Sequence, residues 1–254
     1  MKVKILIVFL IIIFSVSAGF SLENARAITE FGIWNTELSG KADINNVRFD
    51  FKENGDFKNK NILSFGGEYR TGNVSSISFD YHKFDFSGTI NTAINIGSIA
   101  YASGADLTLE QSVFEILGHR NLKKGARGFL ELIYGAKLFS NELNARNTTG
   151  KSSEKYTFPL PQIGIAGEYK LHDHWKFIGE FYGISLLKGN SGAKSKTLET
   201  AVQYTFFKKH KDRKKYADWY ARLGWRAEYL NGRDNNDEFT VDFEGVRLTL
   251  SAKI

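Results

Sequence analysis

The fold is decided by an alternating stretch near the C-terminus, Trp219-Tyr220-Ala221-Arg222-Leu223-Gly224-Trp225-Arg226-Ala227-Glu228-Tyr229. Its apolar and polar side chains repeat with a period of two, which is typical of a β-strand because successive side chains point to opposite faces of a sheet. One face carries apolar side chains such as Leu223 and Trp225, and the other carries Arg222, Arg226 and Glu228. The apolar face suits lipid, and the charged face does not.

The same alternation recurs from Ile28 to the end of the chain, interrupted by polar turns. Soluble strands usually contain about 5–6 residues, whereas a tilted strand that crosses a membrane needs about 9–11. The alternating segments are longer than soluble strands, so we interpret them as membrane strands. The ten predicted strands cover residues 28–42, 58–71, 74–90, 104–120, 126–142, 155–171, 174–188, 193–208, 216–231 and 238–254.

This pattern predicts one all-β domain over residues 28–254, a single antiparallel up-and-down transmembrane β-barrel of about ten strands, within a range of about eight to twelve. A water-soluble sandwich of two packed sheets is the alternative, since its strands also have one apolar face. The charged faces distinguish the two folds, because a barrel encloses them and a sandwich leaves them in solvent.

Short and long connections alternate along the chain, which is typical of a barrel with tight periplasmic turns and larger outer loops. The short connections at 71–73, 122–125 and 171–174 are therefore predicted to be periplasmic. With an even number of strands, both termini lie at the periplasmic end. By the same rule the outward stretches are 43–57, 88–104, 143–154, 189–192 and 232–237.

The first 18 residues are typical of an export signal. Lys2 and Lys4 are basic, residues 5–14 are all apolar, and Val16-Ser17-Ala18 places small side chains where a signal peptidase cleaves. The apolar run is too short for a membrane-spanning helix, which needs about 20 residues. We therefore expect cleavage after residue 18, or after Ala25 as a variant. Residues 19–27 would form a short N-terminal segment, and the mature chain would reach the bacterial outer membrane.

Composition excludes several kinds of site. The chain has no cysteine, so disulfides, thiolate metal ligands and a cysteine nucleophile are excluded. No metal-ligand spacing, phosphate loop or serine elbow is present, and no cofactor or metal is expected. The net charge of +6 includes a basic run at 208–215. We interpret this run as a solvated periplasmic turn, with docking on anionic lipid or an acidic partner as the alternative. Nucleic acid is not an expected partner of an exported chain.

Glutamate recurs at predicted inward positions beside an aromatic residue, as in Gly67-Glu68-Tyr69 and Gly167-Glu168-Tyr169. Basic side chains on the same faces would pair with these carboxylates, because an unpaired buried carboxylate costs several kcal/mol. We therefore predict a charge network in the lumen that contains Glu68, Arg70, Glu131, Glu168, Glu180, Glu199, Arg222, Arg226, Glu228 and Arg247, with Lys137, Lys170 and Lys176 as further bases.

With these features the chain resembles the small outer-membrane β-barrel superfamily of Gram-negative bacteria over essentially its whole mature length. Its tail, residues 246–254, is similar to the alternating C-terminal strand that the family's barrel assembly machinery recognises. Such strands typically end in Phe, whereas this one ends in Ile254. The resemblance implies outer-membrane lipids and that machinery as partners. The apolar phase of the last strand also changes between Phe243 and Val246, which predicts a β-bulge near Gly245.

Two functions are compatible with a charged lumen. A narrow channel for small solutes or ions would use the inward charges as a polar path. The alternative is a structural or surface-interaction barrel whose lumen is filled by paired charges, because eight strands are already filled by side chains and ten add little width. Its outer loops would then bind a partner, and the aromatic, charged residues 47–52 are the candidate loop.

An outer-leaflet hydrolase is the third hypothesis. It rests on His82, with Asp80 on the same face of an outward-leading strand, and it needs this pair at the outer rim. The other four histidines are predicted to lie at periplasmic turns. One Asp–His pair is weak support for catalysis, so we predict that the chain is not an enzyme.

Overall fold

The computed structural model describes residues 25–44, 47–71, 75–91, 93–96, 99–146, 151–186, 191–207, 218–234 and 237–253. The predicted export signal at 1–18 and the basic run at 208–215 lie outside the described residues. In the described part of the chain, no helix has the length and hydrophobicity that a membrane-spanning helix needs. The regular structure of this part consists of β-strands.

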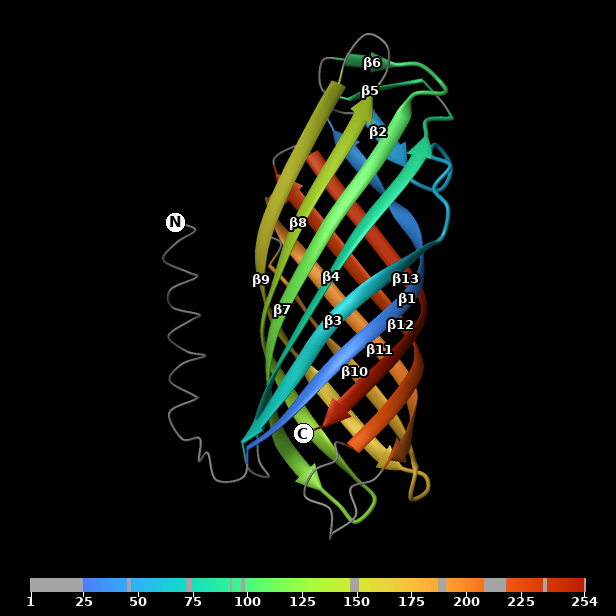
Figure 1. The fold of residues 1–254 in the computed structure, drawn as a ribbon. Coiled ribbons are helices and arrows are strands. Elements are labelled where there is room, and N and C mark those ends of the chain that lie inside the picture. Colours follow the sequence, from blue (N-terminus) through green and yellow to red (C-terminus); the bar gives the residue numbers. More distant parts are fainter. Residues whose placement is uncertain are drawn as a thin grey trace.

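Ten long antiparallel strands form the wall of a closed barrel (Figure 1). They are neighbours in space in their order along the chain. The last strand closes the barrel by pairing with the first, with Ile28 opposite Lys253 and Asp43 opposite Glu238. The predicted barrel of about ten strands is confirmed, and the two-sheet sandwich is wrong. The wall strands are β1 (Ala25–Ile44), β3 (Lys60–Thr71), β4 (Ser75–Thr89), β7 (Asp106–Lys124), β8 (Gly128–Arg146), β9 (Lys151–Lys170), β10 (Trp175–Ser185), β11 (Ser191–Phe207), β12 (Asp218–Asp234) and β13 (Asp237–Lys253).

Three short strands lie at the outer end: β2 (Val47–Asp50), β5 (Ile94–Ile96) and β6 (Ile99–Tyr101). β2 pairs with the outer end of β1, and β5 pairs with β6 in a separate hairpin. Phe49 and Phe51 of the first outer loop are buried in the barrel core. The Tyr101 hydroxyl donates a hydrogen bond to the Ala145 carbonyl at 3.1 Å. Because Phe49 and Phe51 are buried, the first loop covers the outer end of the barrel. These two rings are therefore not exposed for contact with a partner in the way that the surface-interaction hypothesis expects of this loop.

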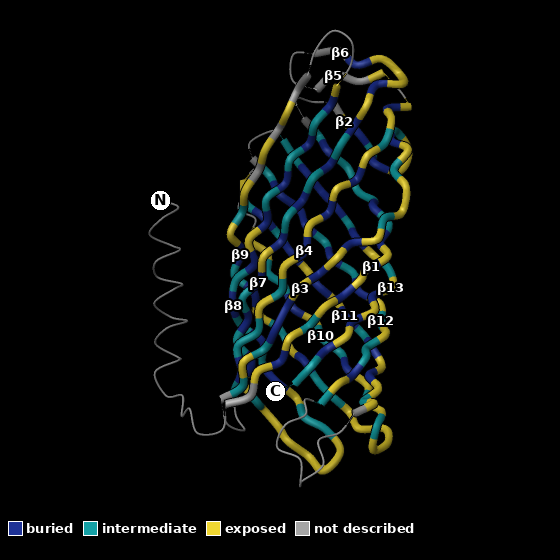
Figure 2. The backbone as a smooth tube through the Cα atoms, in the orientation of Figure 1, coloured by how far each residue is buried: buried dark blue, intermediate teal, exposed yellow. Residues whose placement is uncertain are grey.

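The apolar face of the strands changes sides along the barrel. In the periplasmic half of β4, Phe79 and Tyr81 point outward and are 41% and 44% exposed. Farther out on the same strand, Lys83 takes the outward position, whereas Phe84 and Phe86 point inward and are buried. Exposed and buried residues alternate along the strands in both halves (Figure 2). The periplasmic half thus has an exterior for lipid, and the outer half has a polar exterior around an apolar core.

Aromatic side chains mark the periplasmic edge of the apolar exterior. Tyr69, Tyr169, Trp175, Tyr204 and Trp219 all lie near strand ends at the periplasmic turns and point outward. Tyrosine and tryptophan favour the membrane–water interface, where an amphipathic ring meets the headgroups. The chain is therefore built as a transmembrane β-barrel of the bacterial outer-membrane type, with an outer half that projects beyond the apolar belt.

The predicted β-bulge near Gly245 is wrong. β13 pairs with both β12 and β1 without a register shift. Phe243 and Arg247, on either side of Gly245, both point inward. The inward face of β13 therefore changes from apolar to charged at Gly245, and the strand itself stays regular. Gly245 is needed for a close approach to β1, because a Cβ there would lie 1.8 Å from the Asn35 carbonyl oxygen.

β10 is short and leaves one edge of β9 uncovered at the outer end. Its pairing with β9 ends at Gly183 opposite Ile163. Among the described residues, 151–162 therefore pair only with β8. Pro159 and Pro161, the two prolines of the chain, both lie in this segment. Proline lacks the N–H that an added strand would need, so the pair protects the free edge from unwanted pairing.

Candidate functional site in the barrel lumen

The inward side chains divide the lumen into three layers along the barrel axis. One residue of each layer lies on β4: Ser78 in the layer nearest the periplasm, His82 in the middle layer and Phe84 in the outer layer. Nearest the periplasm is the vestibule, a cavity of about 120 Å³ lined mainly by charged side chains. The outer half is closed by the outer core, the apolar cluster that includes Phe84 and Phe243. Between them lies the ionic plug, which we define as Asp80, His82, Glu115, Lys137, Glu199, Arg226, Glu228 and Arg247.

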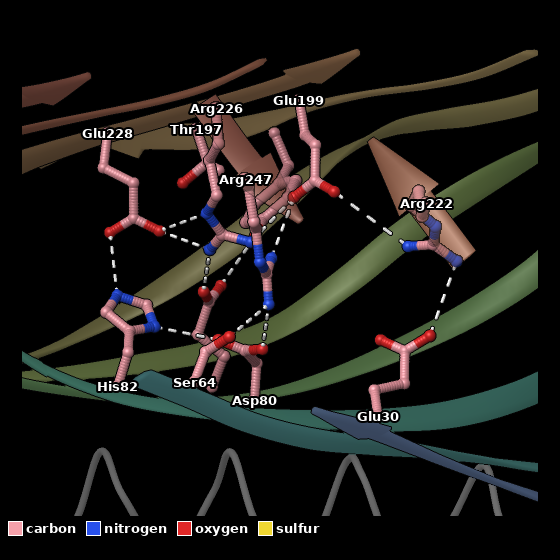
Figure 3. A network of polar contacts seen from close by, with 12 residues as sticks. Glu30, Ser64, Asp80, His82, Thr197, Glu199, Arg222, Arg226, Glu228 and Arg247 are labelled. Atoms are coloured by element: carbon pink, nitrogen blue, oxygen red, sulfur yellow. Dashed lines mark hydrogen bonds and ion pairs between the residues drawn. The ribbon is translucent and has the colours of Figure 1, made fainter. Parts of the chain in front are cut away.

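Arg226 on β12 is the centre of the ionic plug (Figure 3). Its Nη2 lies 2.8 Å from Glu115, its Nη1 lies 3.0 Å from Glu199, and its Nε lies 2.9 Å from Glu228. A guanidinium group offers five N–H donors in a planar fork, so one arginine can hold several carboxylates. Because Glu115 is on β7 and Glu199 is on β11, Arg226 connects the wall across the lumen.

Arg247 on β13 makes a second set of contacts in the plug. Its guanidinium donates hydrogen bonds to Asp80 at 2.8 Å, to Glu199 at 3.0 Å and to the Ser64 hydroxyl at 3.1 Å. Glu199 therefore accepts hydrogen bonds from two arginines, and its other oxygen lies 4.0 Å from a third, Arg222 (Figure 3). Charge-assisted hydrogen bonds of this kind are roughly twice as strong as neutral ones, which offsets part of the cost of taking both charges out of water.

Lys137 on β8 supplies the third fixed positive charge and is fully buried. Its Nζ lies 2.7 Å from the Thr197 hydroxyl, 3.2 Å from Glu115 and 3.4 Å from Glu228. An ammonium group offers three donors, and all three are directed to oxygen here. Lys137 therefore completes the compensation of the two glutamates that it shares with Arg226.

Both ring nitrogens of His82 face carboxylates. Nδ1 lies 2.8 Å from Asp80, and Nε2 lies 3.3 Å from Glu228. An ionised carboxylate only accepts hydrogen bonds, so each nitrogen must carry a proton, and His82 is an imidazolium in this arrangement. The plug is then electrically neutral, as burial away from water requires. Lys137, Arg226, Arg247 and His82 are its cations, and Asp80, Glu115, Glu199 and Glu228 are its carboxylates.

Asp80, His82 and Glu115 each place one possible ligand atom within 4.8 Å of the other two, a spacing that a metal ion could bridge. Arg247 and Arg226 already hold the two carboxylates, and both nitrogens of His82 are engaged. The donor set therefore fits a plug of ion pairs better than a metal centre. His82 is 1% exposed beneath the outer core, so it does not lie at the outer rim as the hydrolase hypothesis requires.

Solvent reaches the vestibule from the periplasmic end. At the mouth, Arg70 pairs with Glu68 at 2.5 Å and Lys176 pairs with Glu168 at 2.6 Å. Both cations keep 34% of their side chains exposed, and both glutamates keep 19%. The side chain of Lys137 in the plug is 0% exposed. Water access therefore decreases inward and ends at the plug.

The outer core fills the lumen beyond the plug. The rings of Phe84 and Phe243 stack with centroids 3.9 Å apart and planes 9° apart. Trp34 packs edge-on against Phe84 at 5.3 Å, and Phe51 of the first loop packs against Phe239 at 5.8 Å. Side chains from β1, β4, β13 and the first loop thus meet inside the barrel and close it.

The ten side chains that the sequence predicts for the lumen all face the interior. Glu199, Arg226, Glu228 and Arg247 belong to the plug, whereas Glu68, Arg70, Glu131, Glu168, Glu180 and Arg222 line the vestibule. Among the further bases, Lys137 is in the plug and Lys176 is at the mouth. Lys170 instead lies 2.7 Å from Asp173 in the turn after β9.

Five interior groups, Glu30, Asp80, His82, Glu115 and His119, are missing from the sequence-based network. The predicted position of His119 at a periplasmic turn is wrong. It is 8% exposed inside the barrel, with Nε2 2.8 Å from the Ser78 hydroxyl and Nδ1 3.5 Å from Glu131. The inward face of β7 is mostly apolar around Glu115, so it does not resemble a charged lumen face. The sequence could have placed Glu115 and His119 inside the barrel, because residues four apart on one strand point to the same face.

Comparison with solved structures finds bacterial proteins of low sequence identity. The translocator domain of the autotransporter NalP from Neisseria meningitidis is 11% identical with a TM-score of 0.42, over 94% of this chain and 92% of that one. Ail, the attachment invasion locus protein of Yersinia pestis, solved with the heparin analogue sucrose octasulfate, is 8% identical with a TM-score of 0.37, over 91% and 99%. The outer membrane protein OprG from Pseudomonas aeruginosa is 10% identical with a TM-score of 0.38, over 91% and 95%.

No protein-family profile matches the sequence, and no curated protein is significantly similar to it. TM-scores below 0.5 at these identities carry no information about a ligand or partner. The pairing and burial of the chain itself establish its class: it is a closed ten-stranded antiparallel barrel of the bacterial outer-membrane type.

Proposed function

We propose that this chain is a closed outer-membrane barrel that acts by binding at its extracellular surface and not by conducting solutes. The outer core is the observation that carries the proposal, because buried rings such as Phe84 and Phe243 occupy the lumen. Protein interiors are packed as densely as organic crystals, so a filled lumen offers no path to a solute. A solute would have to displace this core and also separate the neutral plug below it.

The exterior of the outer half supports a role in binding. Charged side chains of both signs face solvent there, as in the pairs Lys52–Glu37 at 2.9 Å and Lys83–Glu110 at 2.7 Å. Exposed pairs of this kind add little to stability, so the barrel fold does not require them. This polar surface projects beyond the apolar belt and is therefore accessible to a partner outside the cell.

Deletion of the first outer loop should destabilise the barrel as well as change its surface. Removing residues 45–56 takes Phe49 and Phe51 out of the outer core, and losing a buried phenylalanine side chain costs about 3–5 kcal/mol. The double variant Arg48→Ala/Lys52→Ala changes only exposed side chains and should unfold at the same urea concentration as the parent chain. Tryptophan fluorescence during urea unfolding measures both. A deletion variant as stable as the parent would contradict the structural role of the loop.

A narrow channel for small solutes or ions is the alternative function, and the vestibule favours it. The vestibule is open to water and is lined by side chains of both charge signs, as at the entrance of a polar pore. It ends at Lys137 and Arg226, so conduction would require these ion pairs to separate.

Planar-bilayer recording distinguishes the two functions. We expect the parent chain to give no discrete conductance steps. The triple variant Phe84→Ala/Phe243→Ala/Arg226→Gln, which hollows the core and weakens the plug, should conduct and so show that the assay detects a path. The lipid-facing variant Phe65→Ala/Phe79→Ala should remain silent. Conductance steps of the parent chain that change in Arg226→Gln would overturn the closed barrel and support the channel.

A further inference from the structure

Among the described side chains that line the vestibule outside the ionic plug, carboxylates outnumber fixed cations. When Lys176, which pairs with Glu168, is included, five glutamates face three cations, which leaves two negative charges in excess in this set. The glutamates are Glu30, Glu68, Glu131, Glu168 and Glu180, and the cations are Arg70, Lys176 and Arg222. Water at the mouth solvates these carboxylates only in part, so a bound cation would stabilise the excess negative charge.

His119 does not remove the excess. Its Nε2 lies 2.8 Å from the Ser78 hydroxyl, which can donate to a neutral ring, while Nδ1 faces Glu131 at 3.5 Å. A neutral imidazole therefore satisfies both contacts. Even an imidazolium at this position would leave one carboxylate without compensation.

Glu180 on β10 is the vestibule carboxylate without a partner. Glu180 lines the cavity and makes no hydrogen bond or ion pair with any residue that the structure describes. Glu199 lies directly opposite it on β11, but Arg226 and Arg247 already hold that carboxylate. Like charges opposite each other across a strand pair repel. A cation beside Glu180 would relieve this repulsion.

We propose that the vestibule binds one divalent cation that keeps part of its water shell, with the Glu180 carboxylate as its main protein ligand. The two positive charges of such an ion equal the excess of two negative charges. The cavity of about 120 Å³ holds roughly ten water-sized spheres at roughly 10–15 Å³ each, enough for an ion with bound water. Glu131 and Glu180 flank Ala166 on β9, whose small side chain leaves room between the two carboxylates.

The arrangement of the ligands favours a Mg²⁺-like ion. In the described part of the chain, three carboxylate or imidazole ligand atoms converge within 4.8 Å in the plug group Asp80, His82 and Glu115, and no such group occurs in the vestibule. The vestibule therefore has no complete protein cage. Mg²⁺ gives up water reluctantly and is usually bound by one or two carboxylates while it keeps several waters. The ion would enter at the solvent-exposed mouth beside Arg70 and Lys176.

Calorimetric titration of MgCl₂ into the full chain, folded in a non-ionic maltoside detergent, tests the proposal. We expect saturable binding of about one Mg²⁺ per chain, and Glu180→Gln should weaken the binding at least about tenfold. Glu244→Gln is the matched control, because Glu244 is exposed on the outer face of β13 and its exchange should leave the affinity unchanged. A difference in gel mobility between unheated and boiled samples reports that each variant is folded.

A second variant, Ala166→Lys, places a fixed cation between Glu131 and Glu180 and should abolish Mg²⁺ binding in a folded barrel. The proposal is overturned if the parent chain shows no saturable binding, or if Glu180→Gln binds Mg²⁺ as tightly as the parent. It is also overturned if putrescine binds in a Glu180-dependent manner and Mg²⁺ does not. These outcomes do not depend on conductance, so the inference can fail or hold independently of the proposed function.

Discussion

Replacing Arg226 by glutamine should lower the free energy of unfolding by about 3–5 kcal/mol, the usual cost of removing one partner from a buried ion pair. The side chain is 4% exposed and holds Glu115, Glu199 and Glu228. Glutamine can still donate hydrogen bonds, but it cannot compensate three carboxylates from which water is excluded. Urea unfolding in detergent micelles, followed by tryptophan fluorescence, measures the difference.

Arg70→Gln is the matched control for Arg226→Gln. Arg70 is 34% exposed at the periplasmic mouth, where water can reach Glu68 once the arginine is gone, so its loss should cost clearly less than the loss of Arg226. Adding Glu228→Gln to Arg226→Gln should restore part of the lost stability, because it removes one uncompensated charge. If Arg226→Gln were as mild as Arg70→Gln, water would have to reach the plug, and the closed lumen would be wrong.

The wall of the barrel was predictable because lipid imposes a simple rule on every strand that crosses it. On β12, Leu223 and Trp225 must face acyl chains, so alternation alone locates the strand and its two faces. The same parity predicted the ten wall strands and assigned the described turn at 171–174 to the same end as the start of β1. The pattern needed no knowledge of contacts between distant residues.

Alternation shows which residues share a face, but it does not show which face meets lipid. In the outer half the environment is reversed, because water lies outside and protein lies inside. On β13 the outward Val246 and Leu248 give way to the inward Val241 and Phe243, and this change has the same appearance in sequence as a shift of register. The false bulge at Gly245 came from this ambiguity.

The alternation along each strand likewise predicted which side chains face the lumen, but it did not predict which of them form ion pairs with one another. Arg226 and Glu228 are two residues apart on β12 and were both expected inside. Glu115 precedes Arg226 by 111 residues and reaches it from β7. Which strands meet across a lumen depends on the radius and stagger of the closed wall, and neither is visible in a single strand. The partner of a lumen charge therefore requires the structure.

Phe84→Ala should also lower the free energy of unfolding by about 3–5 kcal/mol, because it leaves a cavity in a close-packed interior. Phe84 is 0% exposed and stacks on Phe243, with Trp34 packed against its edge. Urea unfolding in detergent micelles again provides the measurement. The same change should make the outer loops easier to cleave with protease, because the outer half depends on this core for its order.

Phe65→Ala is the control for Phe84→Ala, since Phe65 points outward and is 46% exposed on the lipid-facing surface of β3. It should cost less, because acyl chains or detergent can fill the space left by the ring, whereas the rigid outer core cannot collapse around the space left by Phe84. If the outer half enclosed water, removing Phe84 would take an apolar ring out of water and would not destabilise the barrel. The difference between these two substitutions therefore decides whether the outer half has a protein interior or a wet lumen.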